Sequence, residues 1–259
     1  MTGSADNDYE SVIDAAPSVG YYESLEFNAP MSTTLADELA TLLSSRTPAI
    51  VVDIGCGWAE LLLRVLAMAP LASGLGVDAD VRVLARANAN AGARHLDDRV
   101  TFTTELPEPG STADVVICVG ADHIYGPLPD ALVNLQDLLS PGGVLLLGTG
   151  YWETTPTVEQ AASIGARPDD HRDLADLVDL AMGVGFRLLG LRTATRREWE
   201  QFEFGYLADW ENWLMKWSHD AMAPRIRAQA DTHRNEYLRG WREVLGFAYL
   251  VLGKAQDQT

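Results

Sequence analysis

Short runs of consecutive apolar residues recur along the chain, separated by longer stretches in which apolar residues return at three- and four-residue spacing. The first pattern is typical of strands buried on both faces, and the second is typical of helices with one face against a core. Their alternation predicts an α/β protein with a mostly parallel sheet and helices on both faces. The strands are predicted at residues 49–54, 74–77, 100–103, 113–119, 144–148, 186–193 and 244–252. The helices are predicted at residues 34–43, 60–69, 81–93, 130–139 and 174–183, the first opening with a capping box from Thr34 to Asp37.

Residues 198–241 differ from the rest because Trp, Tyr and charged residues recur there at helical spacing. They predict two helices inserted as a cap, in which residues 232–236 are interpreted as a solvent-exposed face. Residues 1–31 are interpreted as an N-terminal extension that acts as a lid, with Tyr22 as a candidate ligand contact. We therefore expect a single domain over residues 1–259, with the cap as an insertion.

The composition excludes some partners. The chain has 259 residues and a formal net charge of −18. Such a charge repels nucleic acid and anionic membranes, so we expect neither, and an amine or another cation agrees better with it. No basic and apolar leader opens the sequence and no apolar run reaches the roughly 18 residues that span a bilayer, so a cytoplasmic protein is expected. Cys56 and Cys118 are expected to be free thiols.

The clearest chemical signal lies in the turn after the first predicted strand. Residues 51–60 read VVDIGCGWAE, so Asp53 is followed by Gly55 and Gly57. Glycine permits positive φ and close approach of a ligand to the backbone, and open α/β sheets bind ligands at the carboxyl ends of their strands. Asp78 follows the second predicted strand, where its carboxylate can accept hydrogen bonds from the ribose hydroxyls of an adenosine group.

A nicotinamide dinucleotide site has a related turn and a similar acid. Here the glycine pattern is Gly55-x-Gly57-x-Ala59 instead of G-x-G-x-x-G. Asp53 next to this turn would repel a pyrophosphate and attract a sulfonium or ammonium group. The residues therefore favour S-adenosylmethionine (SAM) over NAD.

At these motifs the chain resembles the class I SAM-dependent methyltransferases, over roughly residues 50–252. The matching pieces are VVDIGCG, GVDAD, ADVVICVGA and LSPGGVLLLG, in this order, with Ala59 at the family's third glycine position. The resemblance implies a Rossmann-like seven-stranded sheet in the order 3-2-1-4-5-7-6, with the last strand antiparallel. It implies SAM as the cofactor and assigns residues to parts of it. Those residues are Asp53, Gly55 and Gly57 at the methionine tail, Asp78 at the ribose, Thr104 or Glu105 near the adenine, and Val119 and Gly120 beside the cofactor.

Residues after the fourth and fifth predicted strands are the candidates for acting on a substrate. His123 is a candidate base, because imidazole titrates near neutral pH, and a histidine that caps a loop is the alternative. Asp122 is a candidate for orienting this base or binding an amine. Tyr151 and Trp152 are candidates for the wall of the substrate pocket, and Tyr151 is also a candidate catalytic residue. Glu153 is a candidate contact for a cationic group of the substrate. Packing beneath the cap is the alternative for these three, and no histidine spacing indicates a metal site.

Several functions are compatible with these features. The leading hypothesis is a SAM-dependent methyltransferase that transfers a methyl group to an oxygen or nitrogen atom of a small molecule, by in-line displacement in a capped pocket. The predominance of arginine over lysine favours a bacterial source, in which such enzymes serve secondary metabolism. The alternatives are a SAM enzyme with other chemistry, such as cyclisation, an NAD-binding oxidoreductase, and a SAM-binding protein without catalysis. The acceptor and the oligomeric state stay open.

Overall fold

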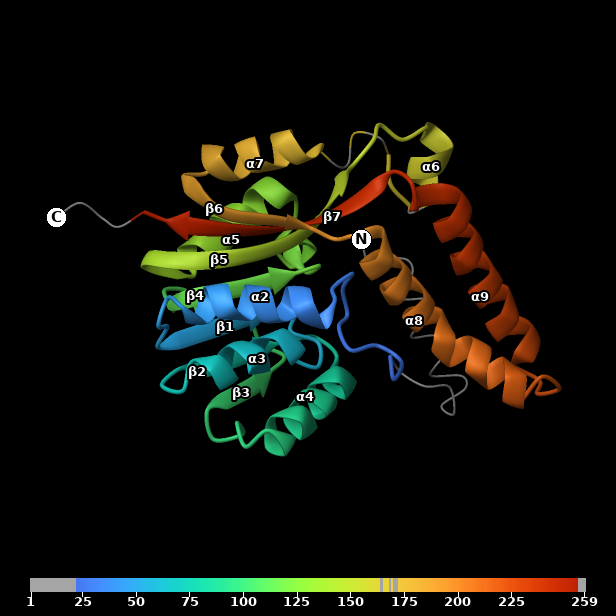
Figure 1. Ribbon diagram of the computed structural model, residues 1–259, viewed down its shortest axis with the longest axis horizontal. Coiled ribbons are helices and arrows are strands. Elements are labelled where there is room, and N and C mark those ends of the chain that lie inside the picture. The colour runs from blue at the N-terminus through green and yellow to red at the C-terminus, as the bar shows by residue number, and fades with distance from the viewer. Residues whose placement is uncertain (1–21, 164, 168, 170–171, 256–259) are drawn as a thin grey trace. The chain divides into compact units, whose positions relative to one another are not determined.

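The computed structural model describes residues 22–163, 165–167, 169 and 172–255, so residues 1–21 of the predicted extension lie outside it (Figure 1). The chain divides into two compact units. The sheet unit consists of Met31–Thr149, Ala175–Thr193 and Phe247–Thr259. The helical unit consists of Met1–Pro30, Gly150–Leu174 and Ala194–Gly246. The predicted cap lies within the helical unit, and its role as a cap stays a prediction.

A seven-stranded sheet in the order β3-β2-β1-β4-β5-β7-β6 organises the sheet unit and confirms the predicted order. Strand β1 pairs in parallel with β2 and β4, while β7 runs antiparallel to β6, as predicted. Every described residue of β1 after the first is buried, as its apolar run requires. The strands are β1 Ile50–Ile54, β2 Ser73–Val77, β3 Val100–Thr103, β4 Ala113–Val119, β5 Leu139–Trp152, β6 Phe186–Thr193 and β7 Leu245–Lys254.

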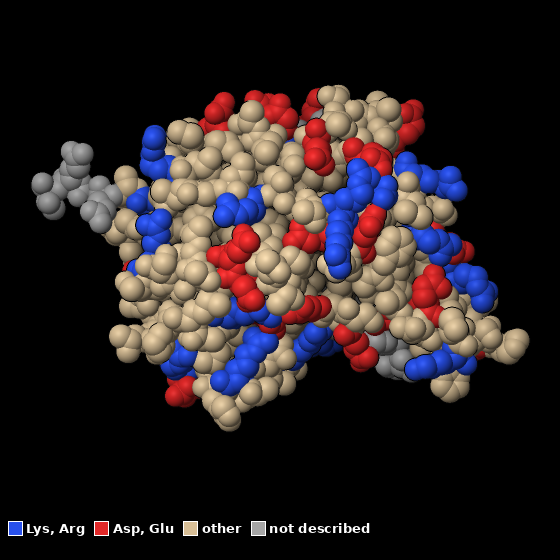
Figure 2. All heavy atoms as spheres, viewed as in Figure 1, with Lys and Arg blue, Asp and Glu red and all other residues tan. Residues whose placement is uncertain are grey.

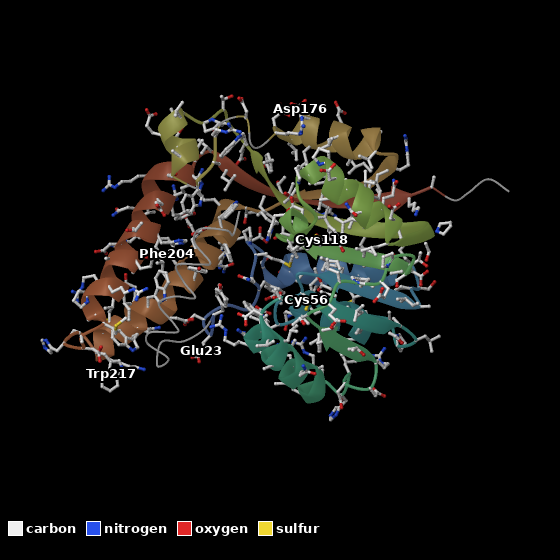
Figure 3. The ribbon with its side chains drawn as sticks, turned by 180° about the vertical axis from the view of Figure 1, so that it is seen from behind. Glu23, Cys56, Cys118, Asp176, Phe204 and Trp217 are labelled. Atoms are coloured by element: carbon white, nitrogen blue, oxygen red, sulfur yellow. The ribbon has the colours of Figure 1, made fainter. Side chains whose placement is uncertain are left out.

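Helices cover both faces of this sheet. Helices α2 and α3 lie in front of the strands in Figure 1, and α5 comes to the front when the molecule is turned in Figure 3. Each turns an apolar stripe inward, such as Leu35, Leu39 and Leu43 of α2. The helical elements here are α2 Thr33–Ser44, α3 Glu60–Met68, α4 Val81–Ala93, the 3₁₀ turn η1 Asp122–Tyr125, α5 Leu128–Asp137 and α7 Leu174–Gly183.

Some predicted boundaries were wrong. The N-cap of α2 is Ser32, not Thr34, because the Ser32 hydroxyl accepts a hydrogen bond from the backbone N–H of Leu35. Strand β5 was expected to begin at Val144, after a break at residues 140–143. It begins at Leu139 instead, because a register shift against β4 accommodates these residues and pairing continues.

The helical unit contains two long helices that run side by side (Figure 1). Both were predicted, and α8 begins at a capping box in which Thr195 and Glu198 bond to each other's backbone N–H groups. None of the helices in the described part of the chain is long and apolar enough to cross a membrane. The elements of this unit are α6 Val158–Ala162, which was not predicted, α8 Arg196–Lys216, α9 Ala223–Glu236 and the π-helical turn η2 Tyr237–Trp241.

Candidate functional site

The carboxyl ends of three adjacent strands form the core of the candidate site. Ile54 at the end of β1 pairs with Val77 at the end of β2, and on its other side with Cys118 of β4. The loops that follow therefore begin next to one another, at the edge of the sheet where α/β folds bind ligands. The predicted cofactor residues that the structure brings together here are Asp53, Gly55, Gly57, Asp78, Val119 and Gly120.

The turn after β1 is fixed to the end of β2. The backbone N–H groups of Gly55 and Cys56 both donate to the carbonyl oxygen of Val77, at 2.8 and 2.9 Å. Gly55 has φ of +71°, and a Cβ atom there would lie 2.2 Å from the Cβ of Ala121. Only glycine meets both conditions, so the first glycine of the motif is required by the fold itself.

Two further glycines leave space beside the backbone. Gly57 and Gly120 have φ of +53° and +71°, and a Cβ atom on either would meet no atom within 4 Å. A ligand can therefore approach the main chain at both positions. Ala59, at the third glycine position of the motif, also has a left-handed backbone with φ of +61°, a conformation that costs an L-residue roughly 1–2 kcal/mol.

Asp78 joins the loops after β1 and β2. Its Oδ2 accepts a hydrogen bond from the N–H of Gly57 at 2.8 Å, and its Oδ1 accepts one from the N–H of Asp80 at 3.0 Å. A carboxylate offers about four lone-pair sites, so it keeps capacity for two ligand hydroxyls. Burial raises the pKa of Asp78, although these two hydrogen bonds oppose the shift.

Asp53 is a buried acid beside this group, with only 4% of its surface exposed. Burial raises the pKa of Asp53 well above its ordinary value, and the negative charge of Asp78 raises it further. Two neighbouring carboxylates in a poorly solvated site favour a positively charged ligand, because a cation relieves both effects. The electrostatics therefore fit a sulfonium or ammonium group and do not fit a pyrophosphate.

The two cysteines lie at the same edge of the sheet (Figure 3). Both are free thiols, as predicted. Burial raises the pKa of Cys56 and of Cys118 far above the ordinary range, and the Asp53 charge adds to this. The thiols therefore stay protonated and are poor nucleophiles.

The predicted base lies in the turn after β4. Asp122 and His123 are in η1, and the hydroxyl of Thr149 at the sheet-unit end of β5 donates to Asp122 Oδ2 at 3.4 Å. Partial burial lowers the pKa of His123, and the charge of Asp122 opposes this. The imidazole is therefore neutral near pH 7, the form that can accept a proton. Thr149 was missed, although it is a polar residue at the end of an apolar run.

Thr104 and Glu105 follow β3, whose Thr103 pairs with Val77 of β2. They therefore lie at the same edge of the sheet as Asp78. Both are exposed, and the N–H of Glu105 donates to the Thr103 hydroxyl at 3.1 Å. Their contact with an adenine stays a prediction.

Four predicted substrate residues belong to the helical unit: Tyr22, Tyr151, Trp152 and Glu153. Tyr22, Tyr151 and Trp152 are buried there, whereas Glu153 is exposed. The N–H of Glu153 donates to the carbonyl of Val244 at 2.8 Å, which fixes this stretch beside the start of β7. Their roles toward a substrate stay predictions.

The beginning of the described chain is attached to α8. Glu23 N–H and the Ser24 hydroxyl donate to the buried carboxylate of Asp209, at 2.9 and 2.7 Å. The ring of Tyr22 packs against that of Tyr206, with centroids 5.5 Å apart. The segment is thus an integral part of the helical unit, and its action as a lid stays a prediction.

A buried polar group between α8 and α9 was missed by the sequence reasoning. His233 Nε2 lies 2.7 Å from Glu203 Oε2, and the imidazole stacks on the ring of Tyr206 with centroids 5.0 Å apart. The interpretation of residues 232–236 as a solvent-exposed face was therefore wrong at His233, because α8 packs against this side of α9. Within the described residues, no group of His, Cys, Asp and Glu side chains could hold a metal ion.

Comparison with known proteins agrees with this geometry. Residues 52–145 match the family described as the methyltransferase domain. The uncharacterized protein YjhP of Escherichia coli is 27% identical over 219 residues, which cover 83% of this chain and 88% of that protein. Its crystal structure superposes with a TM-score of 0.79 at 25% identity, covering 91% of this chain and 98% of the other.

Two further relatives extend the comparison. A SAM-dependent methyltransferase of Geobacter sulfurreducens, solved with S-adenosylhomocysteine (SAH), shares the fold with a TM-score of 0.79 at 24% identity, covering 95% of this chain and 97% of that one. The 27-O-demethylrifamycin SV methyltransferase of Amycolatopsis mediterranei is 33% identical over 134 residues, about half of each chain, at 50% and 49%. The family match over residues 52–145, the ordered motifs and the strand order of this chain are all consistent with the class I SAM-dependent methyltransferases, whose cofactor is S-adenosylmethionine.

Proposed function

We propose that this protein transfers a methyl group from SAM to a nitrogen or oxygen atom of a small molecule. The observation that carries the proposal is a pair of carboxylates, the buried Asp53 and the half-buried Asp78, beside a glycine turn with open space at Gly57. Such a site attracts a cation and admits it close to the backbone.

The residues of the sheet unit fit the parts of SAM one by one. Asp78 has the free lone pairs to accept the two ribose hydroxyls, while Asp53 offers negative charge to the ammonium and sulfonium groups. Gly57 and Gly120 leave room for the methionine tail and for the body of the cofactor. When bound, SAM supplies an electrophilic methyl group, so the protein chiefly has to position the acceptor and accept its proton.

His123 is the proposed base of the sheet unit, and Asp122 its orienting partner. The lowered pKa of His123 keeps the imidazole ready to accept a proton at neutral pH. Tyr151, Trp152 and Glu153 of the helical unit are proposed to contact the acceptor.

Two observations support a small acceptor. The methyltransferase from Amycolatopsis is named for a small-molecule substrate, 27-O-demethylrifamycin SV. The net charge of −18 disfavours nucleic acid, and acidic and basic side chains are interspersed over the face shown in Figure 2.

Calorimetry and product mass test the proposal. SAM and SAH should bind at micromolar strength and NAD should not, and Asp78→Ala should weaken SAM by about 1–3 kcal/mol through lost ribose hydrogen bonds. Acceptors are then screened with SAM, and each product is weighed. A gain of one methyl group supports the proposal, a rearranged product of unchanged mass would indicate cyclisation, and binding of NAD in place of SAH would refute the cofactor assignment.

A further inference from the structure

Glu203 carries a carboxylate into the interior of the helical unit, with 3% of its surface exposed. His233 Nε2, at 2.7 Å, is its one hydrogen-bond partner among the described residues. The nearby Arg242 pairs with Glu200 and Glu243 instead. Because a carboxylate has about four acceptor sites, most of the capacity of Glu203 is unused, and a buried carboxylate in this condition is costly.

Tyr237 adds a second incomplete polar group on the same side of α9, one helical turn after His233. It is 1% exposed, and within the described residues its hydroxyl has no hydrogen-bond partner. Burial raises the pKa of Tyr237 to about 12, and the charges of Glu203 and Glu200 contribute. The charges of Arg242 and Arg196 oppose this shift, and the phenol stays protonated.

Aromatic rings surround these groups. His233 stacks on Tyr206 and meets the edge of Trp241 at a centroid distance of 5.8 Å. Tyr237 makes edge contacts of 6.0 Å with both Trp241 and Phe204, the latter labelled in Figure 3. Tyr237 and Trp241 bound the π-helical turn η2, a geometry that is frequent at functional sites. Aromatic faces attract cations, so these rings complement the carboxylate.

We propose that Glu203 and Tyr237, within this aromatic cluster, bind the ammonium group of a small amine that has an apolar body. An ammonium group has three donors, which match the free lone pairs of the Glu203 carboxylate and of the Tyr237 hydroxyl. An anionic ligand is disfavoured by the buried negative charge, and a neutral alcohol offers the carboxylate no charge-assisted hydrogen bond. The inference goes beyond the proposed methyl transfer and does not rest on it.

Calorimetry on the full chain tests the inference with a matched pair of probes, phenethylamine and phenethyl alcohol, in the absence of SAM. The amine should bind at least about tenfold more tightly than the alcohol, because a charge-assisted hydrogen bond is worth about one factor of ten or more. Tyr237→Phe should weaken the amine about three- to tenfold and leave the alcohol unchanged. It should also raise Tm, because it removes a buried hydroxyl that has no partner. This variant therefore cannot fail simply by unfolding.

Glu203→Gln should abolish the preference for the amine, since the amide keeps the shape and removes the charge. Glu211→Gln is the matched control, because Glu211 is an exposed residue of the same helix. Equal binding of the two probes, no binding of the amine, or unchanged binding in Tyr237→Phe would overturn the inference. SAM binding and methyl transfer to alcohols are measured separately, so the methyltransferase proposal can survive that outcome.

Discussion

Replacing Asp53 by Asn should stabilise the cofactor-free protein and weaken its binding of SAM. The carboxylate is 4% exposed, and both burial and the Asp78 charge raise its pKa. A carboxyl group whose folded-state pKa is raised contributes stability below its unfolded-state pKa and loses that contribution as pH rises through the folded-state value. At a pH above this raised pKa, the folded wild-type protein therefore carries a buried charge that the asparagine variant lacks.

The expected gain follows from the burial. Removing one unfavourable charge of this kind typically adds about 1–2 kcal/mol to the free energy of unfolding. For a chain of this length that corresponds to about 2–4 °C in Tm per kcal/mol, hence a rise of about 2–8 °C. The difference between variant and wild type should shrink as pH falls through the raised pKa of Asp53, because the wild-type carboxyl becomes protonated in the folded state.

SAM binding should change in the opposite direction. A hydrogen bond to a charged group is worth about 1.5–3 kcal/mol, so Kd for SAM should rise about 10- to 100-fold in Asp53→Asn. SAH lacks the sulfonium charge and should lose less.

Thermal melts with and without each ligand measure both effects, since a ligand stabilises the folded state according to its Kd. Asp98→Asn is the control, because Asp98 is exposed and this substitution changes the net charge by the same amount as Asp53→Asn. A lower Tm for cofactor-free Asp53→Asn, or equal losses for SAM and SAH, would refute the reasoning.

Four other substitutions separate folding from binding and catalysis. Gly55→Ala should lower Tm more than Gly57→Ala, because a Cβ atom at Gly55 would lie 2.2 Å from the Cβ of Ala121, whereas one at Gly57 meets open space. Gly57→Ala should instead weaken SAM binding, measured by calorimetry. Equal losses of Tm in the two variants would contradict this reasoning. Asp78→Asn should weaken SAM by about 1–3 kcal/mol in calorimetry, and an unchanged Kd would show that the ribose lies elsewhere. His123→Ala should lower kcat about 100-fold or more and leave the Kd of SAM unchanged. The rate of the wild-type enzyme should rise as pH increases through the lowered pKa of His123. An unaffected kcat in His123→Ala would exclude His123 as the base.

The positions of Asp53, Gly55, Gly57 and Asp78 at one edge of the sheet could be predicted because their signals are local. Asp53, Gly55 and Gly57 are contiguous with an apolar strand, so the strand-to-turn boundary alone fixes where they lie. Asp78 follows the next strand, and parallel neighbours end at the same edge of the sheet. The positions predicted for these residues from the apolar pattern and the strand order therefore agree with the register of the sheet in the structure.

Elements that depend on long-range pairing were predicted less well. Pro141 and the two glycines after it are local signals for a break in regular secondary structure, and the start of β5 was therefore predicted too late in the chain. The strand continues because its neighbour β4 pairs with Leu139 before the shift and with Val144 after it. Local propensity cannot reveal such a pairing, because the partner residues belong to another part of the chain.

The Glu203–His233 pair was missed for a related reason. The two residues are 30 positions apart; Glu203 lies in a helix with aromatic residues at three- and four-residue spacing, and His233 lies four residues before Tyr237. That spacing predicts a buried face, but it does not distinguish a face packed on a core from a face that binds a ligand. Only the packing of α8 on α9 shows that a carboxylate, an imidazole and a phenol converge.

Asp53 and Tyr237 share a physical property that links the two proposed sites. Each is a buried polar group that the cofactor-free protein stabilises poorly, the first because of its burial and a neighbouring like charge, and the second because its hydroxyl has no partner among the described residues. Groups of this kind persist where a ligand completes their interactions. A purely structural role predicts that Asp53→Asn and Tyr237→Phe change Tm alone. A binding role predicts that both variants raise Tm, that Asp53→Asn weakens the binding of SAM, and that Tyr237→Phe weakens the binding of the amine. Asp53→Asn should leave the affinity for the amine unchanged, and Tyr237→Phe should leave the affinity for SAM unchanged.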